Sequence, residues 1–169
     1  SVISNFQFPI SNFQLIRNKE NYGFAKGCNI GARNARGKCL LFLNSDTQVL
    51  DRGFLKMVDF LDTSKEIGIL GGKLLNPDHS PQPSAGKFYT MFNFLLLLIG
   101  GERFGWLRGS PKKIAKVDWI SGACFMISHK LFEKIKGFDE RFFMYMEDME
   151  LCFKAKLLGF STYFYPNIK

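Results

Sequence analysis

An apolar run that stops at a carboxylate constrains this sequence more than any other feature. In LLFLNSDTQV, residues 40–49, nearly continuous hydrophobic side chains give way abruptly to Asn44, Ser45, Asp46 and Thr47. An unbroken apolar run of this length is typical of a strand that is buried on both faces. We therefore expect a core strand that carries Asp46 to the edge of a sheet, where its carboxylate faces a cleft.

Segments with helical and strand-like patterns alternate along the rest of the chain. Four helices are predicted: from Asn21 to Gly37, after a capping Asp51, around residues 131–135 up to Gly137, and at residues 147–158. In the second of these, Phe54, Leu55, Val58 and Leu61 share one side. Strands are predicted at residues 38–43, 67–75, 117–127 and 160–165. Residues 77–86 hold three prolines and are expected to form an exposed loop. The alternation predicts an α/β sandwich with a largely parallel sheet that includes an antiparallel strand. Ligands collect at the carboxyl ends of the strands in such sheets, and this places Asp46 at the functional edge.

Composition narrows the class of partner. The 169 residues, 46% of them hydrophobic, suffice for one globular core, and the net charge of +8 favours acidic partners such as a nucleotide diphosphate, a membrane surface or nucleic acid. No dense basic tract or aromatic-basic RNA motif is present, which argues against nucleic acid. The four cysteines lack metal-ligand spacing and are expected to be reduced, buried thiols.

The end of the first strand has the chemistry of a metal site. Mg²⁺ and Mn²⁺ prefer oxygen ligands and often take only one or two carboxylates, with water and substrate phosphates completing the shell. Asp46 is the expected metal ligand, and Asn44 is expected to add an amide oxygen or to bind a sugar hydroxyl. The alternative is that residues 44–47 only form a capped turn.

A second acidic group lies in FFMYMEDMELC, residues 142–152. Glu147, Asp148 and Glu150 open a predicted helix directly after an aromatic-rich run. Apolar surroundings raise the affinity of a carboxylate for protons, as a general base for a sugar hydroxyl requires. The alternative is that these acids only complement the helix dipole.

Several enzyme classes are disfavoured. Residues 31–38 resemble a phosphate-binding P-loop, but the spacing is one residue too long and the segment runs from helix to strand. The chain has no G-x-G-x-x-G fingerprint of a dinucleotide oxidoreductase and no G-x-S-x-G elbow of a hydrolase.

Four motifs in order resemble family 2 glycosyltransferases, in particular the bacterial rhamnosyltransferase-like branch. The motifs are N-x-G-F-A-x-G-x-N-x-G at residues 21–31, L-x-L-N-S-D-T at 41–47, W-I-S-G-A-C-F-M-I at 119–127 and G-F-D-E-R-F-F-M-Y-M-E-D-M-E-L-C at 137–152, and the likeness covers about residues 18–166. The resemblance implies the A-type glycosyltransferase fold and one-step transfer, with inversion, from a nucleotide-diphospho-sugar.

The resemblance also implies roles for individual residues. Asp46 matches the metal-binding aspartate of the family's D-x-D element, with Asn44 at its first position and Ser45 beside the donor. Asp148 matches the catalytic base, and Glu147 is expected to orient that base or the acceptor. The remaining matches are Trp119, Ser121 and Gly122 in the sugar and acceptor pocket, and Asn21, Gly23 and Asn29 in the helix under the nucleotide, more as scaffold than as contacts.

The resemblance further predicts the organisation and setting of the chain. Residues 18–169 are expected to be part of a catalytic domain that lacks family elements at both ends, and residues 1–17, in which ISNFQ occurs twice, to be an atypical segment. The donor is expected to be a dTDP- or UDP-sugar, and the acceptor a glycan or a polyprenyl-linked glycan in cell-surface polysaccharide synthesis.

The expected location is the cytoplasm or the inner face of the membrane. The apolar residues 88–101 are too few to span a bilayer and are expected to form a buried helix or to meet the membrane or acceptor. Two other functions stay open: a non-catalytic binding module for sugar nucleotides or membrane surfaces, and a sugar nucleotidyltransferase.

Overall fold

A computed structural model describes residues 14–50, 53–63, 65–91 and 107–167. The expected Asp51 cap, most of the ISNFQ duplication and most of the apolar segment 88–101 lie outside these ranges. Within them, no helix has both the length and the apolar character needed to cross a bilayer.

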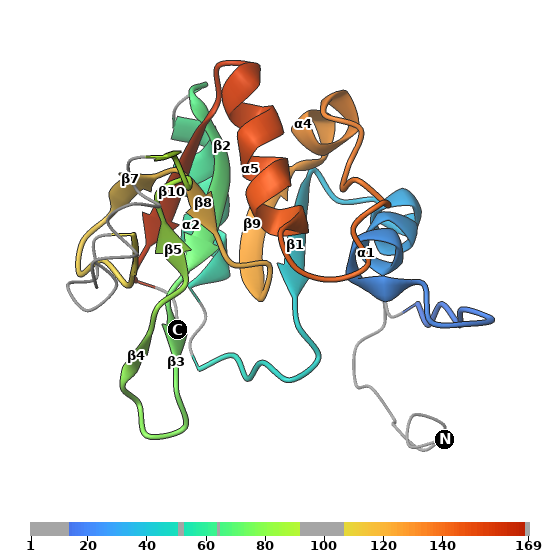
Figure 1. Cartoon of the computed structure of the whole chain (residues 1–169), viewed down its shortest axis with the longest axis horizontal. Helices are drawn as coiled ribbons and strands as arrows, with labels where there is room; N and C mark the ends of the chain where they lie inside the picture. Colours follow the sequence, from blue (N-terminus) through green and yellow to red (C-terminus); the bar gives the residue numbers. More distant parts are fainter. Residues whose placement is uncertain (1–13, 51–52, 64, 92–106, 168–169) are drawn as a thin grey trace.

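The centre of the fold is a mixed five-stranded sheet (Figure 1). Its strands, in spatial order, are β1 (Cys39–Leu43), β9 (Cys124–Ser128), β2 (Ile67–Gly72), β10 (Ser161–Tyr165) and β7 (Ala115–Val117). Strands β1, β2 and β10 run in one direction, while β9 and β7 run in the other. The α/β class and the mixed sheet are confirmed, but two antiparallel strands are present, and only β2 and β10 are parallel neighbours.

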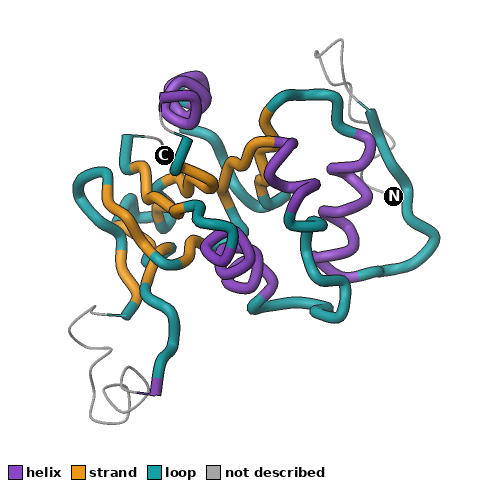
Figure 2. The backbone as a smooth tube through the Cα atoms, turned by 90° about the horizontal axis from the view of Figure 1, so that it is seen from above, coloured by secondary structure: helices purple, strands orange, loops and turns teal. Residues whose placement is uncertain are grey.

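Helices cover both faces of this sheet (Figures 1 and 2). Helices α1 (Gly23–Asn34), α4 (His129–Lys134) and α5 (Glu147–Leu157) pack on one face, and α2 (Phe54–Thr63) packs on the other. Successive side chains of a strand point to opposite faces of the sheet. Phe125 and Ile127 of β9 therefore pack in the core beneath α1, α4 and α5, while Met126 packs in the core beneath α2.

Strand β1 is buried on one face only, and the expectation of burial on both faces is wrong. Leu40 and Phe42 are buried under α1, whereas Leu41 and Leu43 are 38% and 39% exposed. The reason is that β1 is the last strand of the described sheet, and of its residues only Cys39 reaches the core beneath α2.

The buried side of α2 also differs from the prediction. Met57 and Leu61 are buried, whereas Leu55 is 76% exposed. The helix is therefore rotated about its axis relative to the predicted orientation, and Phe54 and Val58 lie at the margin of the core.

Three segments form shorter strands than predicted. The strand expected at 67–75 is split into β2 and β3 (Leu74–Leu75), and β3 pairs with β4 (Pro81–Gln82). The supposed loop 77–86 thus contains a hairpin and then β5 (Ala85–Gly86), which lies between β6 (Arg108–Gly109) and β8 (Trp119–Ile120). The strand expected at 117–127 is broken between β8 and β9, with Gly122 in the intervening turn.

The carboxyl-terminal half agrees more closely with the sequence. Gly137 and Gly159, both at positive φ, follow α4 and α5 as expected, since a left-handed residue ends a helix most easily when it is glycine. Strand β10 forms where a strand was predicted. Leu158, expected on the buried stripe of α5, is 45% exposed because the helix ends at Leu157.

Candidate active site

The end of β1 lies beside the turn at residues 121–123. Because β1 and β9 are antiparallel, Leu43 pairs with Cys124, and the Asn44 N–H donates to the Ala123 carbonyl at 3.0 Å. The Thr47 N–H then donates to the Asn44 carbonyl at 3.1 Å, which closes a turn. Ser45 and Asp46 are exposed on this turn, so the Asp46 carboxylate faces solvent at the edge of the sheet.

Helix α5 brings Asp148 to the other side of the same turn. The Gly122 N–H donates to Oδ2 of Asp148 at 2.9 Å, and the Met149 N–H donates to Oδ1 at 2.7 Å. The turn at residues 121–123 therefore connects the two acidic segments that the sequence singled out. Asn44, Asp46 and Asp148 lie at one end of the sheet.

The start of α1 completes this end of the sheet. A Cβ atom on Gly122 would lie 3.2 Å from Cζ of Phe24 and 3.6 Å from Cβ of Asp148. The Phe24 N–H donates to the Phe143 carbonyl at 2.9 Å. That carbonyl leaves no room for a side chain at position 23, where Gly23 has a φ of +79°. Oδ1 of Asn21 accepts the Gly23 N–H at 3.0 Å. All four sequence motifs thus meet around Gly122.

Asn29 joins α1 to the segment that leads to α5. Its Nδ2 donates to the Phe138 carbonyl at 2.9 Å and to Oε1 of Glu140 at 3.1 Å, while its Oδ1 accepts the Phe138 N–H at 2.9 Å. The side chain is buried, and both ends of its amide are engaged. These contacts place Asn29 in the scaffold.

Glu147 points into the protein. It is only 6% exposed, and its Oε2 has no hydrogen-bond partner among the described residues. Burial is the main cause that raises the pKa of this carboxyl above 4.5, and the charge of Asp148 raises it further, while a backbone hydrogen bond opposes both. Burial together with the Glu147 charge raises the pKa of the Cys28 thiol on α1 to about 12.

The segment that precedes the acidic pair is strained and exposed. Tyr145 and Met146 both have φ of 72°, a left-handed conformation that costs a non-glycine residue roughly 1–3 kcal/mol. Their side chains are 77% and 49% exposed, and Phe143 and Met144 beside them are also exposed. Strain of this kind is concentrated at functional sites. The sequence indicated an aromatic-rich run but not this strain, because neither Tyr nor Met is a residue type that predicts a left-handed backbone.

Trp119 and Ser121 connect the turn at residues 121–123 to the three-stranded sheet formed by β6, β5 and β8. Trp119 is buried and donates from Nε1 to the Lys87 carbonyl at 2.9 Å. The Ser121 N–H donates to the Ser84 carbonyl at 2.7 Å, and Oγ of Ser121 accepts the Ala123 N–H at 3.3 Å. Ser84 is buried, with an Oγ that has no partner among the described residues. Ser84 could not be identified from the sequence, because its proline-rich surroundings indicated an exposed loop.

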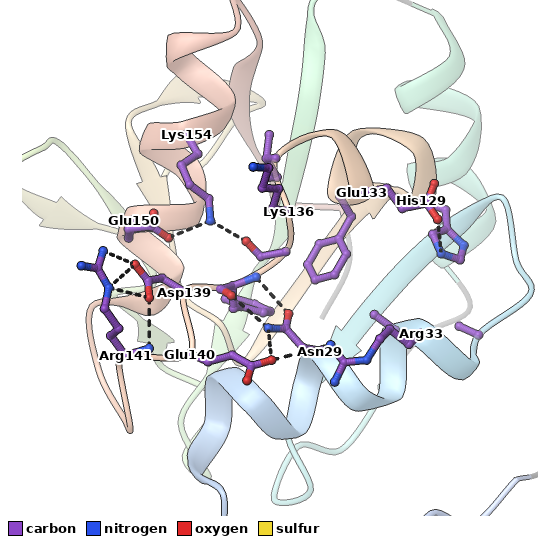
Figure 3. A pocket seen from close by; sticks show the side chains of 16 residues that line it. Asn29, Arg33, His129, Glu133, Lys136, Asp139, Glu140, Arg141, Glu150 and Lys154 are labelled. Carbon is purple, nitrogen blue, oxygen red and sulfur yellow. Dashed lines mark hydrogen bonds and ion pairs between the residues drawn. The ribbon is translucent and has the colours of Figure 1, made fainter.

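A hollow of about 900 Å³ lies away from these residues, between α1, α4 and the segment before α5 (Figure 3). Asn29 is the one expected site residue that lines it. Three of its acidic groups are paired with cations: Arg33 lies 3.6 Å from Glu140, Arg141 lies 2.6 Å from Asp139, and Lys154 lies 3.3 Å from Glu150. The hollow is therefore separate from the end of the sheet that carries Asp46 and Asp148.

The residues at the end of β1 are compatible with a divalent cation. The described ranges contain no cluster of three His, Cys, Asp or Glu side chains that could enclose a metal ion by themselves. One exposed carboxylate beside a half-buried asparagine instead suits Mg²⁺ or Mn²⁺ whose remaining ligands are phosphate oxygens and water.

Comparison with known proteins identifies the family. The family model described as Glycosyl transferase family 2 matches residues 2–136, which is most of the chain. The protein belongs to glycosyl transferase family 2. The match begins within the segment 1–17 that the sequence set apart, and it ends before Glu147 and Asp148.

Two curated relatives of this family 2 chain are named as a hexosyltransferase and a rhamnosyltransferase. The low-salt glycan biosynthesis hexosyltransferase Agl10 of Haloferax volcanii is 29% identical over 145 residues, which are 80% of this chain and 44% of that protein. The N-acetylglucosaminyl-diphospho-decaprenol L-rhamnosyltransferase of Mycobacterium tuberculosis is 26% identical over 136 residues, or 76% of this chain and 44% of the relative. The family 2 chain thus spans less than half the length of these relatives.

Comparison of structures supports the same fold. The crystal structure of GalNAc-T7 with UDP, GalNAc and Mn²⁺ superposes with a TM-score of 0.66 at 17% identity, covering 92% of this chain and 31% of that one. The family 2 chain therefore has the A-type glycosyltransferase fold that its motifs predicted.

Proposed function

We propose that this chain carries the sugar-transfer site of an inverting glycosyltransferase that uses a nucleotide-diphospho-sugar donor and a glycan or lipid-linked acceptor. The observation that carries the proposal is the hydrogen bond from Gly122 to Asp148, because the turn that makes it also holds the end of β1 through Ala123. Asp148, the proposed base, and Asp46, the proposed ligand on the donor side, thereby lie at one end of the sheet. Membership of family 2 supports this reading.

Asp148 is the proposed general base. The N–H groups of Gly122 and Met149 hold its two oxygens, so the carboxylate has a defined orientation before the substrate arrives. Each oxygen retains a further lone pair, with which it can accept the proton of the acceptor hydroxyl as that oxygen attacks the anomeric carbon.

Glu147 acts indirectly in this scheme. It is buried, and its raised pKa reflects that burial, so we assign it to positioning the start of α5 and not to touching the acceptor. Trp119, Ser121 and Gly122 would shape the pocket for the sugar and acceptor. Asn21, Gly23 and Asn29 would support the nucleotide side through α1.

Asp46 is the proposed ligand of Mg²⁺ or Mn²⁺, with Asn44 and Ser45 beside the donor. A bound divalent cation would neutralise charge on the diphosphate leaving group. Asp46 contributes a single exposed carboxylate from a turn that the hydrogen bond between Asn44 and Ala123 anchors. The donor expected from the sequence is a dTDP- or UDP-sugar, and the expected place of work is the cytoplasm at or near the inner face of the membrane.

The first test is calorimetric titration with UDP, dTDP and GDP, each with and without Mn²⁺. We expect binding of one nucleotide that requires the metal and is lost in Asp46→Ala. Asp59→Ala, which removes an exposed carboxylate from α2, is the matched control and should bind as the wild type does. Metal-dependent binding that survives in Asp46→Ala would refute the assigned ligand.

The second test separates a transferase from a binding module. Asp148→Asn keeps the size of the side chain but removes the base, so sugar transfer should fall by at least about a hundredfold while nucleotide binding persists. Equal transfer by the variant would exclude Asp148 as the base. Release of pyrophosphate in place of a nucleoside diphosphate would favour the nucleotidyltransferase.

A further inference from the structure

The outer face of α5 exposes large apolar side chains. Phe153 and Leu157 are 46% and 69% exposed, and their spacing of four residues places them on the same side of the helix. The opposite side holds Leu151, Cys152 and Ala155 in the core. Helix α5 is therefore apolar on the side that packs on the core and also on the outer side, which carries Phe153 and Leu157.

Residues 87–91 extend this exposed surface. The Phe88 ring packs edge-on against the Phe153 ring, with centroids 5.5 Å apart and an interplanar angle of 83°. Tyr89 and Met91, one and three residues after Phe88, are 45% and 87% exposed. Phe88 thus joins two segments that are far apart in the sequence into one patch.

Lysines surround the patch. Nζ of Lys156 lies 5.0 Å from the centre of the Phe88 ring and 3.2 Å from Oδ1 of Asp118, and Lys87 lies 3.9 Å from Oδ2 of the same aspartate. Two lysines therefore share one carboxylate, in a chain whose net charge is +8.

We propose that this surface, defined as Tyr89, Met91, Phe153 and Leu157 with Lys87 and Lys156 and named the α5 face, rests on an anionic membrane. Aromatic and aliphatic side chains beside lysines are the composition with which a peripheral helix enters the interfacial region of a bilayer. Each lysine near an anionic surface strengthens binding about fivefold. Asp118 is shared by both lysines of the α5 face, so the pair of lysines keeps an excess positive charge that a purely apolar partner would leave uncompensated.

Contact through the α5 face would set the distance between the membrane and the site; this step rests on the proposed function. Asp148 is in the first turn of α5, and Leu157 is its last residue. A rise of 1.5 Å per residue separates the two by about 13 Å along the helix axis. One rigid helix would thus present the base to the head of an acceptor whose lipid lies in the bilayer.

The test is co-sedimentation of the full chain with vesicles of phosphatidylcholine alone and with equimolar phosphatidylcholine and phosphatidylglycerol. We expect binding to the anionic vesicles that weakens with salt, and about tenfold weaker binding for Leu157→Glu, which removes apolar area and adds a repelling charge. Leu55→Glu is the matched control, since Leu55 is 76% exposed on α2, across the sheet. This control should bind within about twofold of the wild type.

Three outcomes would overturn the proposal. The first is no binding of the wild type to anionic vesicles at low salt, and the second is an equal effect of both substitutions. The third is a changed gel-filtration volume for Leu157→Glu with unchanged vesicle binding, which would mean that a second copy or residues 92–106 cover the α5 face. Nucleotide titration and circular dichroism of the same variants distinguish this result from failure of the active site or of folding.

Discussion

Replacing Asn29 by alanine tests whether one amide holds α1 against the segment that leads to the acidic pair. The variant would leave the N–H and the carbonyl of Phe138 without partners, and Phe138 is buried at 2% exposure. Each buried backbone group left unsatisfied costs about 1–3 kcal/mol. The contact with Glu140 is partly exposed and adds less. We therefore expect Asn29→Ala to lower the free energy of unfolding by about 3 kcal/mol, a large share of the 5–15 kcal/mol typical of a domain.

The assay is urea unfolding followed by circular dichroism, with Asn34→Ala as the control. Asn34 is an exposed asparagine of the same helix, and its Nδ2 donates to the Ile30 carbonyl one turn earlier. Its removal should change the free energy of unfolding by no more than about 0.5 kcal/mol. If Asn29→Ala cost less than about 1 kcal/mol, or no more than the control, the reasoning from buried unpaired groups would be refuted.

Three further predictions follow from named positions. Gly27→Ala should raise the free energy of unfolding by about 0.5–1 kcal/mol, because a Cβ at this helical position meets nothing within 4 Å; a lower melting temperature would contradict this. Stability of the wild type should fall as pH rises above about 4.5, because folded Glu147 retains a proton that the unfolded chain releases. In Glu147→Gln, the urea midpoint should depend less on pH between about pH 4.5 and 7, and an unchanged dependence would exclude Glu147 as the cause. The same variant should speed alkylation of Cys28 by iodoacetamide at mildly alkaline pH, because the Glu147 charge helps raise the thiol pKa to about 12; mass spectrometry would show it, and an unchanged rate would contradict it.

Local patterns in the sequence predicted the elements that local forces determine. The apolar period of α5, the glycine that follows it and the strand after Gly159 all appear where they were expected. The family and its fold could be inferred from the order of four motifs, because each motif reports a local requirement such as the positive φ of Gly23. These features depend on residues close together in the chain.

Features that depend on distant partners could not be inferred in this way. The exposure of Leu41 follows from the position of β1 at the end of the sheet, and no property of residues 40–43 reveals strand order. Ser84 is buried because β5 lies between β6 and β8, although its proline-rich neighbours indicate a loop. Glu147 and Asp148 are adjacent acids, yet one is buried and the other bonds to Gly122; only tertiary packing distinguishes them.

The strand order has a consequence for how the chain acquires its structure. Strand β9 separates β1 from β2, so these two strands, which are synthesised before β9, cannot pair with each other in their native arrangement. They must wait until residues 124–128 are synthesised, and β2 gains its other neighbour only with β10. Pairing between strands so distant in sequence slows folding and prolongs the time during which unpaired strand edges can aggregate. We therefore expect the yield of folded chain to be sensitive to chaperones and to the temperature of expression.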